Sequence, residues 1–274
     1  MVKPGYRVLA TDLDHTLLNA SGGVSSTNRM ALKRAREAGW ELVIASGRRL
    51  DSVRQLLRML DVSAYQVCLN GALVATPNGR QLLNAPIAID TVLSLFDLAA
   101  DSNVNLMLNT MSTTYCASGR DAIDVPEYIT NVAGKTLLRG RGELSTLLTE
   151  HAVYKVAFNS QNHEELIDLA QQVNGTKLAN VVWSDTAYVE MTAPGVSKLS
   201  GLATVATYSG IGLQHFVACG DYENDIEMLN GTGLGVAMDN ALPQVRRSAD
   251  LVVPNRGADG VGMIINQLLD QQKG

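Results

Sequence analysis

Short apolar runs alternate with amphipathic stretches over the first seventy residues of the chain. The run at residues 42–45 is fully apolar, and the runs at 8–11 and 65–69 are largely so, which is typical of strands buried on both faces. Between them, apolar residues recur at helical spacing over about 26–38 and 51–60. Strand, helix, strand, helix and strand with short links predicts the α/β class with a doubly wound, Rossmann-like parallel sheet.

The pattern then changes twice. Residues 73–83 predict an antiparallel hairpin, and residues 87–186 carry alternating strands with a few helices, which is typical of an α+β module. Buried strands and helices of the first kind resume near the C-terminus. We therefore expect a core formed by residues 1–86 and 187–274, with an inserted α+β cap domain at residues 87–186.

Composition narrows the classes of partner. The 274 residues carry a net charge of −5, are 46% hydrophobic and hold 5% aromatics, which argues against a nucleic-acid surface. We find neither a signal peptide nor an apolar run long enough to span a bilayer. Three cysteines far apart predict buried free thiols. We expect a cytoplasmic protein without nucleic-acid or membrane partners, as a monomer or a small homo-oligomer.

Two aspartates close the first predicted strand. Asp12 and Asp14 are two positions apart, so an extended chain points both side chains to one side. Like charges so close indicate a shared cation, a shared proton or a division into acid and base. Aspartate is also common in the turns that close strands, so this pair alone leaves both interpretations open.

Other polar residues also lie where predicted strands end or where a helix begins. Ser46 follows the second strand, and Asp221, Asn224 and Asp225 follow a later one, while Lys198 begins a predicted helix. The carboxyl ends of parallel strands meet in one crevice of an open sheet. Carboxylates with one lysine and a hydroxyl suit phosphoryl transfer, which needs a cation such as Mg²⁺ and fixed donors around phosphate oxygens.

These residues also carry a family resemblance that covers essentially the whole chain. The segments Asp12-Leu13-Asp14-x-Thr16, Ser46-Gly47-Arg48, Lys198 and Gly220-Asp221-x-x-Asn224-Asp225 resemble the four motifs of the haloacid dehalogenase (HAD) superfamily. The segments Asn70-Gly71-Ala72, Gly195-Val196-Ser197-Lys198 and Asn255 through Val261, with the insertion between the second and third motifs, resemble its Cof-type (IIB) subfamily, which carries a C2B cap.

The resemblance implies three catalytic residues and a Mg²⁺ cofactor. Asp12 would be the nucleophile that forms an aspartyl phosphate, and Asp14 would protonate the leaving alcohol and then accept a proton from water. Lys198 would neutralise the nucleophile and the phosphate. The metal ligands would be the Asp12 side chain, the Asp14 backbone carbonyl and Asp221.

The remaining motif residues would surround the phosphate. Thr16, Ser46 and Gly47 would bind or order it, and Asn224 would contact it. Asp225 would support a metal-bound water or orient Lys198. The family usually has glycine where this chain has His15, which we interpret as a tolerated variant turned away from the pocket, while a narrowed entrance or a substrate contact stays open.

The sequence leaves substrate selection open. Cap residues that could reach a leaving group are Tyr115, Arg120, Arg139, Arg141 and Lys155. Arg48 and Arg49 could bind phosphate, although arginines near a helix start are more often salt-bridge partners. We expect a phosphatase acting on small phosphorylated metabolites such as sugar phosphates, nucleotides or cofactor phosphates. A phosphomutase and a non-hydrolytic phosphoacceptor or binding module are the alternatives, and Asp14 disfavours the latter because it supplies an acid and base.

Overall fold

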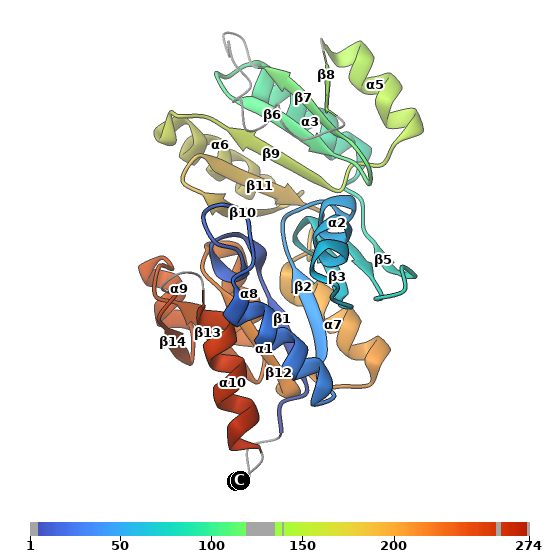
Figure 1. Ribbon diagram of the computed structural model, residues 1–274. Coiled ribbons are helices and arrows are strands. Elements are labelled where there is room, and N and C mark those ends of the chain that lie inside the picture. The colour runs from blue at the N-terminus through green and yellow to red at the C-terminus, as the bar shows by residue number, and fades with distance from the viewer. Residues whose placement is uncertain (1–4, 119–134, 139, 256–258, 273–274) are drawn as a thin grey trace. The chain divides into compact units, whose positions relative to one another are not determined.

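The chain forms two compact units in the computed structural model, which describes residues 5–118, 135–138, 140–255 and 259–272 (Figure 1). The first, here called the core unit, comprises Met1–Arg48, Ser52–Asn84 and Ser197–Gly274. The second, the cap unit, comprises Arg49–Asp51 and Ala85–Val196. Each unit is built around a sheet of its own.

The core unit holds an eight-stranded sheet. Its strands, in spatial order, are β14 (Leu251–Val253), β13 (Leu234–Met238), β12 (Phe216–Gly220), β1 (Val8–Thr11), β2 (Glu41–Ala45), β3 (Tyr65–Cys68), β4 (Leu73–Ala75) and β5 (Gln81–Asn84). The first six run parallel, and β4 and β5 add an antiparallel hairpin. The predicted doubly wound parallel sheet is confirmed.

Helices cover both faces of this sheet, which explains why its central strands are apolar throughout. They are α1 (Ser26–Glu37), α2 (Leu50–Leu60), α7 (Lys198–Ser209), α8 (Ile226–Gly231), α9 (Pro243–Ser248) and α10 (Gly260–Gln271). Helix α1 packs against α10, and α7 packs against α8. Alternate residues of β1, Val8 and Ala10, face the cluster that includes Leu202 and Val205 of α7.

The cap unit holds a six-stranded sheet. Its strands, in spatial order, are β10 (Asn180–Asp185), β11 (Tyr188–Thr192), β9 (Lys155–Asn159), β6 (Asn105–Asn109), β7 (Thr114–Ser118) and β8 (Lys135–Leu137). All neighbours are antiparallel except β7 and β8. Its helices are α3 (Ile89–Ala100), α5 (Arg141–Glu150) and α6 (His163–Thr176).

The boundary at the end of the cap differs from the sequence-based expectation. Strand β11, placed by the sequence at the beginning of the second core segment, pairs with β9 and β10 of the cap sheet, so the cap unit extends to Val196. An alternating strand can join either sheet, and only long-range pairing decides which. Helix α1 begins where the spacing predicts and is capped by Ser25, whose hydroxyl accepts from the Asn28 amide.

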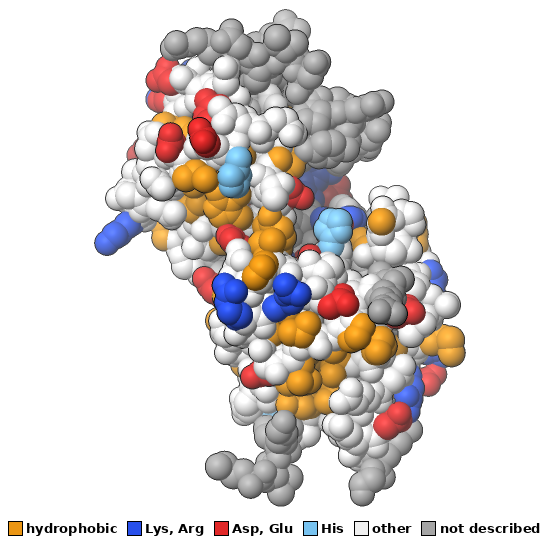
Figure 2. All heavy atoms as spheres, turned by 90° about the vertical axis from the view of Figure 1, so that its left-hand side faces the viewer, with side chains coloured by type: hydrophobic (Ala, Val, Ile, Leu, Met, Phe, Trp, Pro, Cys, Tyr) orange, Lys and Arg blue, Asp and Glu red, His pale blue; other side chains and the backbone are white. Residues whose placement is uncertain are grey.

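The surface shown in Figure 2 mixes acidic and basic side chains among its described residues, so no single-sign basic region covers that face. Among the described helices, none combines the length and the apolar character that a membrane span requires. The three cysteines are buried and form no disulfide within the described residues, as predicted.

Candidate active site

The turn after β1 places the first two motif aspartates. The Asp12 amide donates to the Cys219 carbonyl (2.9 Å), which continues the pairing of β1 with β12 by one residue. The chain then forms one wide turn, closed by a 2.8 Å bond from the Leu18 amide to the Leu13 carbonyl. Asp12 is buried at its start, and Asp14 is exposed within it.

Lys198 reaches this turn from the first residue of α7. Its ammonium donates to Asp12 Oδ1 at 2.7 Å and to Asp225 Oδ1 at 2.6 Å, and the side chain is 1% exposed. The helix start can approach because Gly71, at φ +102°, lacks a side chain: a Cβ there would lie 2.0 Å from the Ser197 carbonyl oxygen. The geometry thus gives one buried cation two carboxylate partners.

Asp225 is in turn fixed by the loop that follows β12. Its Oδ2 accepts from the amides of Asp221 (2.9 Å) and Tyr222 (3.1 Å). A Cβ on Gly220 would lie 2.5 Å from the Asp225 side chain, so glycine makes room for this carboxylate. Asp221 itself accepts a 2.7 Å bond from the Thr16 hydroxyl, which ties the third aspartate to the turn after β1.

The carboxylates fit a divalent cation. Asp12, Asp221 and Asp225 each offer an oxygen within 4.8 Å of the other two. Lys198 supplies only one positive charge to these three carboxylates, so the cluster has room for about two more. Hard oxygen ligands of this kind suit Mg²⁺. Asp225 already pairs with Lys198 and two amides, which leaves Asp12 and Asp221 as the better-placed ligands.

The pKa values of these groups reflect the same excess of negative charge. Burial raises the pKa of Asp12 well above its ordinary value, Lys198 opposes this shift, and Asp225 and Asp221 add to it. Burial and then Asp225 raise the pKa of Asp221 to about 6. Burial alone would lower the pKa of Lys198, but Asp12 and Asp225 outweigh it and keep the lysine charged. A bound cation would favour the ionised form of both raised carboxyls.

The residues expected around a phosphate lie at neighbouring strand ends. Ser46 is buried after β2, and its hydroxyl accepts from the Arg48 amide (3.2 Å), with Gly47 between them. Asn224 donates to Asn70 Oδ1 (3.3 Å), a residue held at φ +56° beyond β3. Thr16 is buried and engaged with Asp221.

Two features of this region were missed by reasoning from the sequence. The first is an ion pair in which Arg48 donates from Nε (2.9 Å) and Nη2 (2.5 Å) to the two oxygens of Asp14. The pair joins residues from two separate motifs, and no local pattern signals it.

The second feature is the pair of asparagine side chains that hold the backbone at His15. His15 sits at φ +59°, which accounts for the glycine expected there. Its carbonyl accepts from the side-chain amides of Asn240 (3.1 Å) and Asn255 (2.9 Å), which hold that strained backbone in place. Its ring is among the groups that lower the pKa of Asp221.

The cap residues that could reach a leaving group each have a different environment. Lys155 is buried and pairs with Glu190, Arg141 pairs with Asp97 at the surface, and the Tyr115 ring lies 6.1 Å from that of His151. Arg120 and Arg139 lie outside the described residues.

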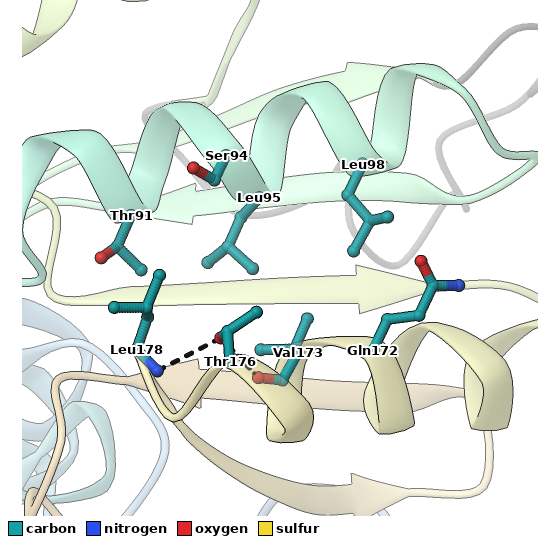
Figure 3. Close-up of a pocket in the computed structure, with 8 residues that line it drawn as sticks. All are labelled: Thr91, Ser94, Leu95, Leu98, Gln172, Val173, Thr176 and Leu178. Atoms are coloured by element: carbon teal, nitrogen blue, oxygen red, sulfur yellow. Dashed lines mark hydrogen bonds between the residues drawn. The ribbon is translucent and has the colours of Figure 1, made fainter.

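A groove of about 340 Å³ runs between α3 and α6 of the cap unit (Figure 3). Its lining, which includes Leu95, Leu98 and Val173, is largely apolar and holds none of the motif residues.

Fold and side chains together define a hydrolase of the phosphoryl-transfer type: a doubly wound sheet with an insertion, and carboxylates and a lysine at its strand ends. Residues 9–265 match the profile of the family described as haloacid dehalogenase-like hydrolase, so the chain belongs to that family.

Named relatives agree with this assignment. The chain is 27% identical to "5-amino-6-(5-phospho-D-ribitylamino)uracil phosphatase YcsE" of Bacillus subtilis over 94% of each protein. It is also 27% identical to "Pyridoxal phosphate phosphatase YbhA" of Escherichia coli, over 94% of this chain and 97% of that one. A solved haloacid dehalogenase-like hydrolase from B. subtilis superimposes with a TM-score of 0.87 at 25% identity, covering 96% of this chain and 99% of the other.

Proposed function

We propose that this protein is a Mg²⁺-dependent phosphatase that hydrolyses small phosphorylated metabolites through an aspartyl phosphate on Asp12. The observation that carries the proposal is the buried Lys198 ammonium, which contacts Asp12 and Asp225 at once while Asp221 stands within reach of both carboxylates. This arrangement holds a nucleophile and a cation site side by side, where a phosphate dianion needs both.

In the first step, a carboxylate oxygen of Asp12 attacks phosphorus as the bond from phosphorus to the ester oxygen breaks. Asp14 gives its proton to the departing alkoxide, so the product leaves as a neutral alcohol. Lys198 stays fixed between Asp12 and Asp225, and its charge offsets the repulsion between the carboxylate and the dianion. Thr16, Ser46 and Asn224 order the phosphate side of the site.

In the second step, water attacks the phosphorus of the aspartyl phosphate, and Asp14 accepts the proton that water loses. The bond from phosphorus to Asp12 breaks, which returns Asp12 as a carboxylate and Asp14 as an acid. The Asp12 and Asp221 side chains and the Asp14 backbone carbonyl would hold Mg²⁺, with Asp225 in support, and the bound ion would supply positive charge against the phosphate oxygens.

The substrate class follows from the relatives. Two of them are named for phosphate esters of small molecules, a ribitylaminouracil and pyridoxal. Because each aligns with nearly the whole of this chain, we extend small phosphorylated metabolites as a class to this protein.

The test is release of inorganic phosphate from a panel of sugar phosphates, nucleotides and pyridoxal phosphate, with Mg²⁺ and with EDTA. We expect turnover that requires Mg²⁺ and falls by about 10³-fold or more in Asp12→Asn, because the nucleophile is lost. Asp14→Asn should slow turnover by about 10²–10⁴-fold. Undiminished phosphate release by the Asp12 variant would overturn the proposed mechanism.

A further inference from the structure

Asp14, the proposed acid and base, lies in a bidentate ion pair with Arg48. Nε of the guanidinium donates to Oδ2 at 2.9 Å and Nη2 donates to Oδ1 at 2.5 Å. Within the described part of the chain, Arg48 is the only hydrogen-bond donor to this carboxylate. The side chains are 35% and 51% exposed, so the pair adds little to stability.

The backbone from which Arg48 extends is anchored on both sides. Its amide donates to the Ser46 hydroxyl (3.2 Å), and its carbonyl accepts from the Leu69 amide (3.0 Å). The guanidinium therefore starts from a fixed point at the end of β2. Two parallel N–H···O bonds from a planar group fix the plane of a carboxylate as well as its position.

We propose that Arg48 is a positioning residue that orients the Asp14 carboxylate for proton transfer. This inference rests on the proposed phosphatase function. The wide turn that carries Asp14 leaves its side chain exposed, so the turn alone does not fix where the carboxylate points. Arg48 supplies that constraint from a neighbouring strand.

The proton balance shows where the orientation matters. In the first step Asp14 loses its proton to the ester oxygen as the phosphorus–oxygen bond breaks, and it ends as a carboxylate. That carboxylate is the form that Arg48 holds through two hydrogen bonds. In the second step one carboxylate oxygen of Asp14 accepts a proton from the attacking water. At the same time the oxygen of that water bonds to phosphorus, and the bond between phosphorus and Asp12 breaks.

The dependence of kcat on the leaving group of the substrate provides the test. An alkyl phosphate has a basic leaving group that needs a proton, whereas p-nitrophenyl phosphate needs little help from an acid. We expect Arg48→Met to lower kcat for an alkyl phosphate by about 10²-fold and kcat for p-nitrophenyl phosphate by less than about tenfold. Arg48→Lys should not restore the alkyl rate, since a lysine cannot make the paired bonds.

Two controls separate positioning from other roles. Arg34→Met removes a matched Arg–Asp pair, with Asp270 and exposures of 37% and 64%, and should leave both rates unchanged. In the Asp14→Asn background, Arg48→Met should cause no further loss, because the group it positions is gone.

The outcomes distinguish this inference from the function on which it rests. A rise in KM for both substrates that persists in the Asp14→Asn background would assign Arg48 to direct phosphate binding and overturn the positioning role. Equal loss of kcat for both substrates would also overturn it. A wild-type protein that hydrolyses neither ester would overturn the proposed function and this inference together.

Discussion

Lys198 is a cation that the fold buries almost completely, at 1% exposure. Such burial is tolerated because Asp12 and Asp225 both accept from its ammonium. We expect Lys198→Met to cost about 3–5 kcal/mol of unfolding free energy at neutral pH, because two carboxylates then stay buried without their partner. Phosphate release should be lost as well.

Urea unfolding in EDTA measures this cost. The matched control is Lys33→Met, which removes an exposed pair with Glu37 and should change stability by about 0.5 kcal/mol or less. Equal losses in the two variants would contradict a special role for the buried ammonium.

Asp221 should make stability depend on pH in a defined direction. Its pKa is raised from 3.8 to about 6, so the folded state holds this proton more tightly than the unfolded state does. Stability of the metal-free protein is therefore lost as the pH rises from about 4 through about 6. Asp221→Asn removes this loss and should stabilise the metal-free protein at pH 7.5 by about 1–3 kcal/mol.

Unfolding curves in EDTA between pH 4 and 8 provide the measurement, and the advantage of Asp221→Asn should disappear near pH 4. Added Mg²⁺ should reverse the order of stability at pH 7.5, because the variant lacks one of the proposed metal ligands. A difference that stays constant across this pH range would contradict the assignment.

At the scale of elements, the start of α7 depends on one glycine. Gly71→Ala would place a Cβ 2.0 Å from the Ser197 carbonyl oxygen and force a residue with a side chain to φ +102°. We expect the helix start to shift, Lys198 to leave its two carboxylates, and kcat to fall by about 10²-fold or more.

The matched control is Gly39→Ala. Gly39 has φ +83° but open space around it, so only the backbone cost of about 1 kcal/mol applies, and kcat should be retained. Steady-state kinetics with thermal unfolding separates the two effects. Full activity in Gly71→Ala would show that this close approach does not position the lysine.

Elements were predictable where local patterns suffice. The apolar runs of β1, β2 and β12 identify buried strands because both faces of the sheet are covered. The wide turn at Leu13–Leu17 was not predicted, since it depends on His15 at φ +59° and on Asn240 and Asn255, far away in sequence.

At the scale of the whole molecule, the sequence gives the order of the motifs along the chain but not which of their side chains contact one another. Parallel topology explains why Asp12, Ser46 and Asp221 end neighbouring strands, and that convergence could be predicted. The pairing of Arg48 with Asp14 could not, because an arginine near a helix start has many acceptable partners. The assignment of β11 to the cap sheet likewise rests on long-range register.

The central claim is that Asp12 carries the phosphoryl group during turnover. Acid quenching during turnover with Mg²⁺, followed by peptide mass analysis, tests it most directly. We predict a phosphorylated peptide whose modified residue is Asp12, formed in wild type and absent in Asp12→Asn. Sustained phosphate release with no phosphorylated Asp12, or with the phosphoryl group on another residue, would contradict the account.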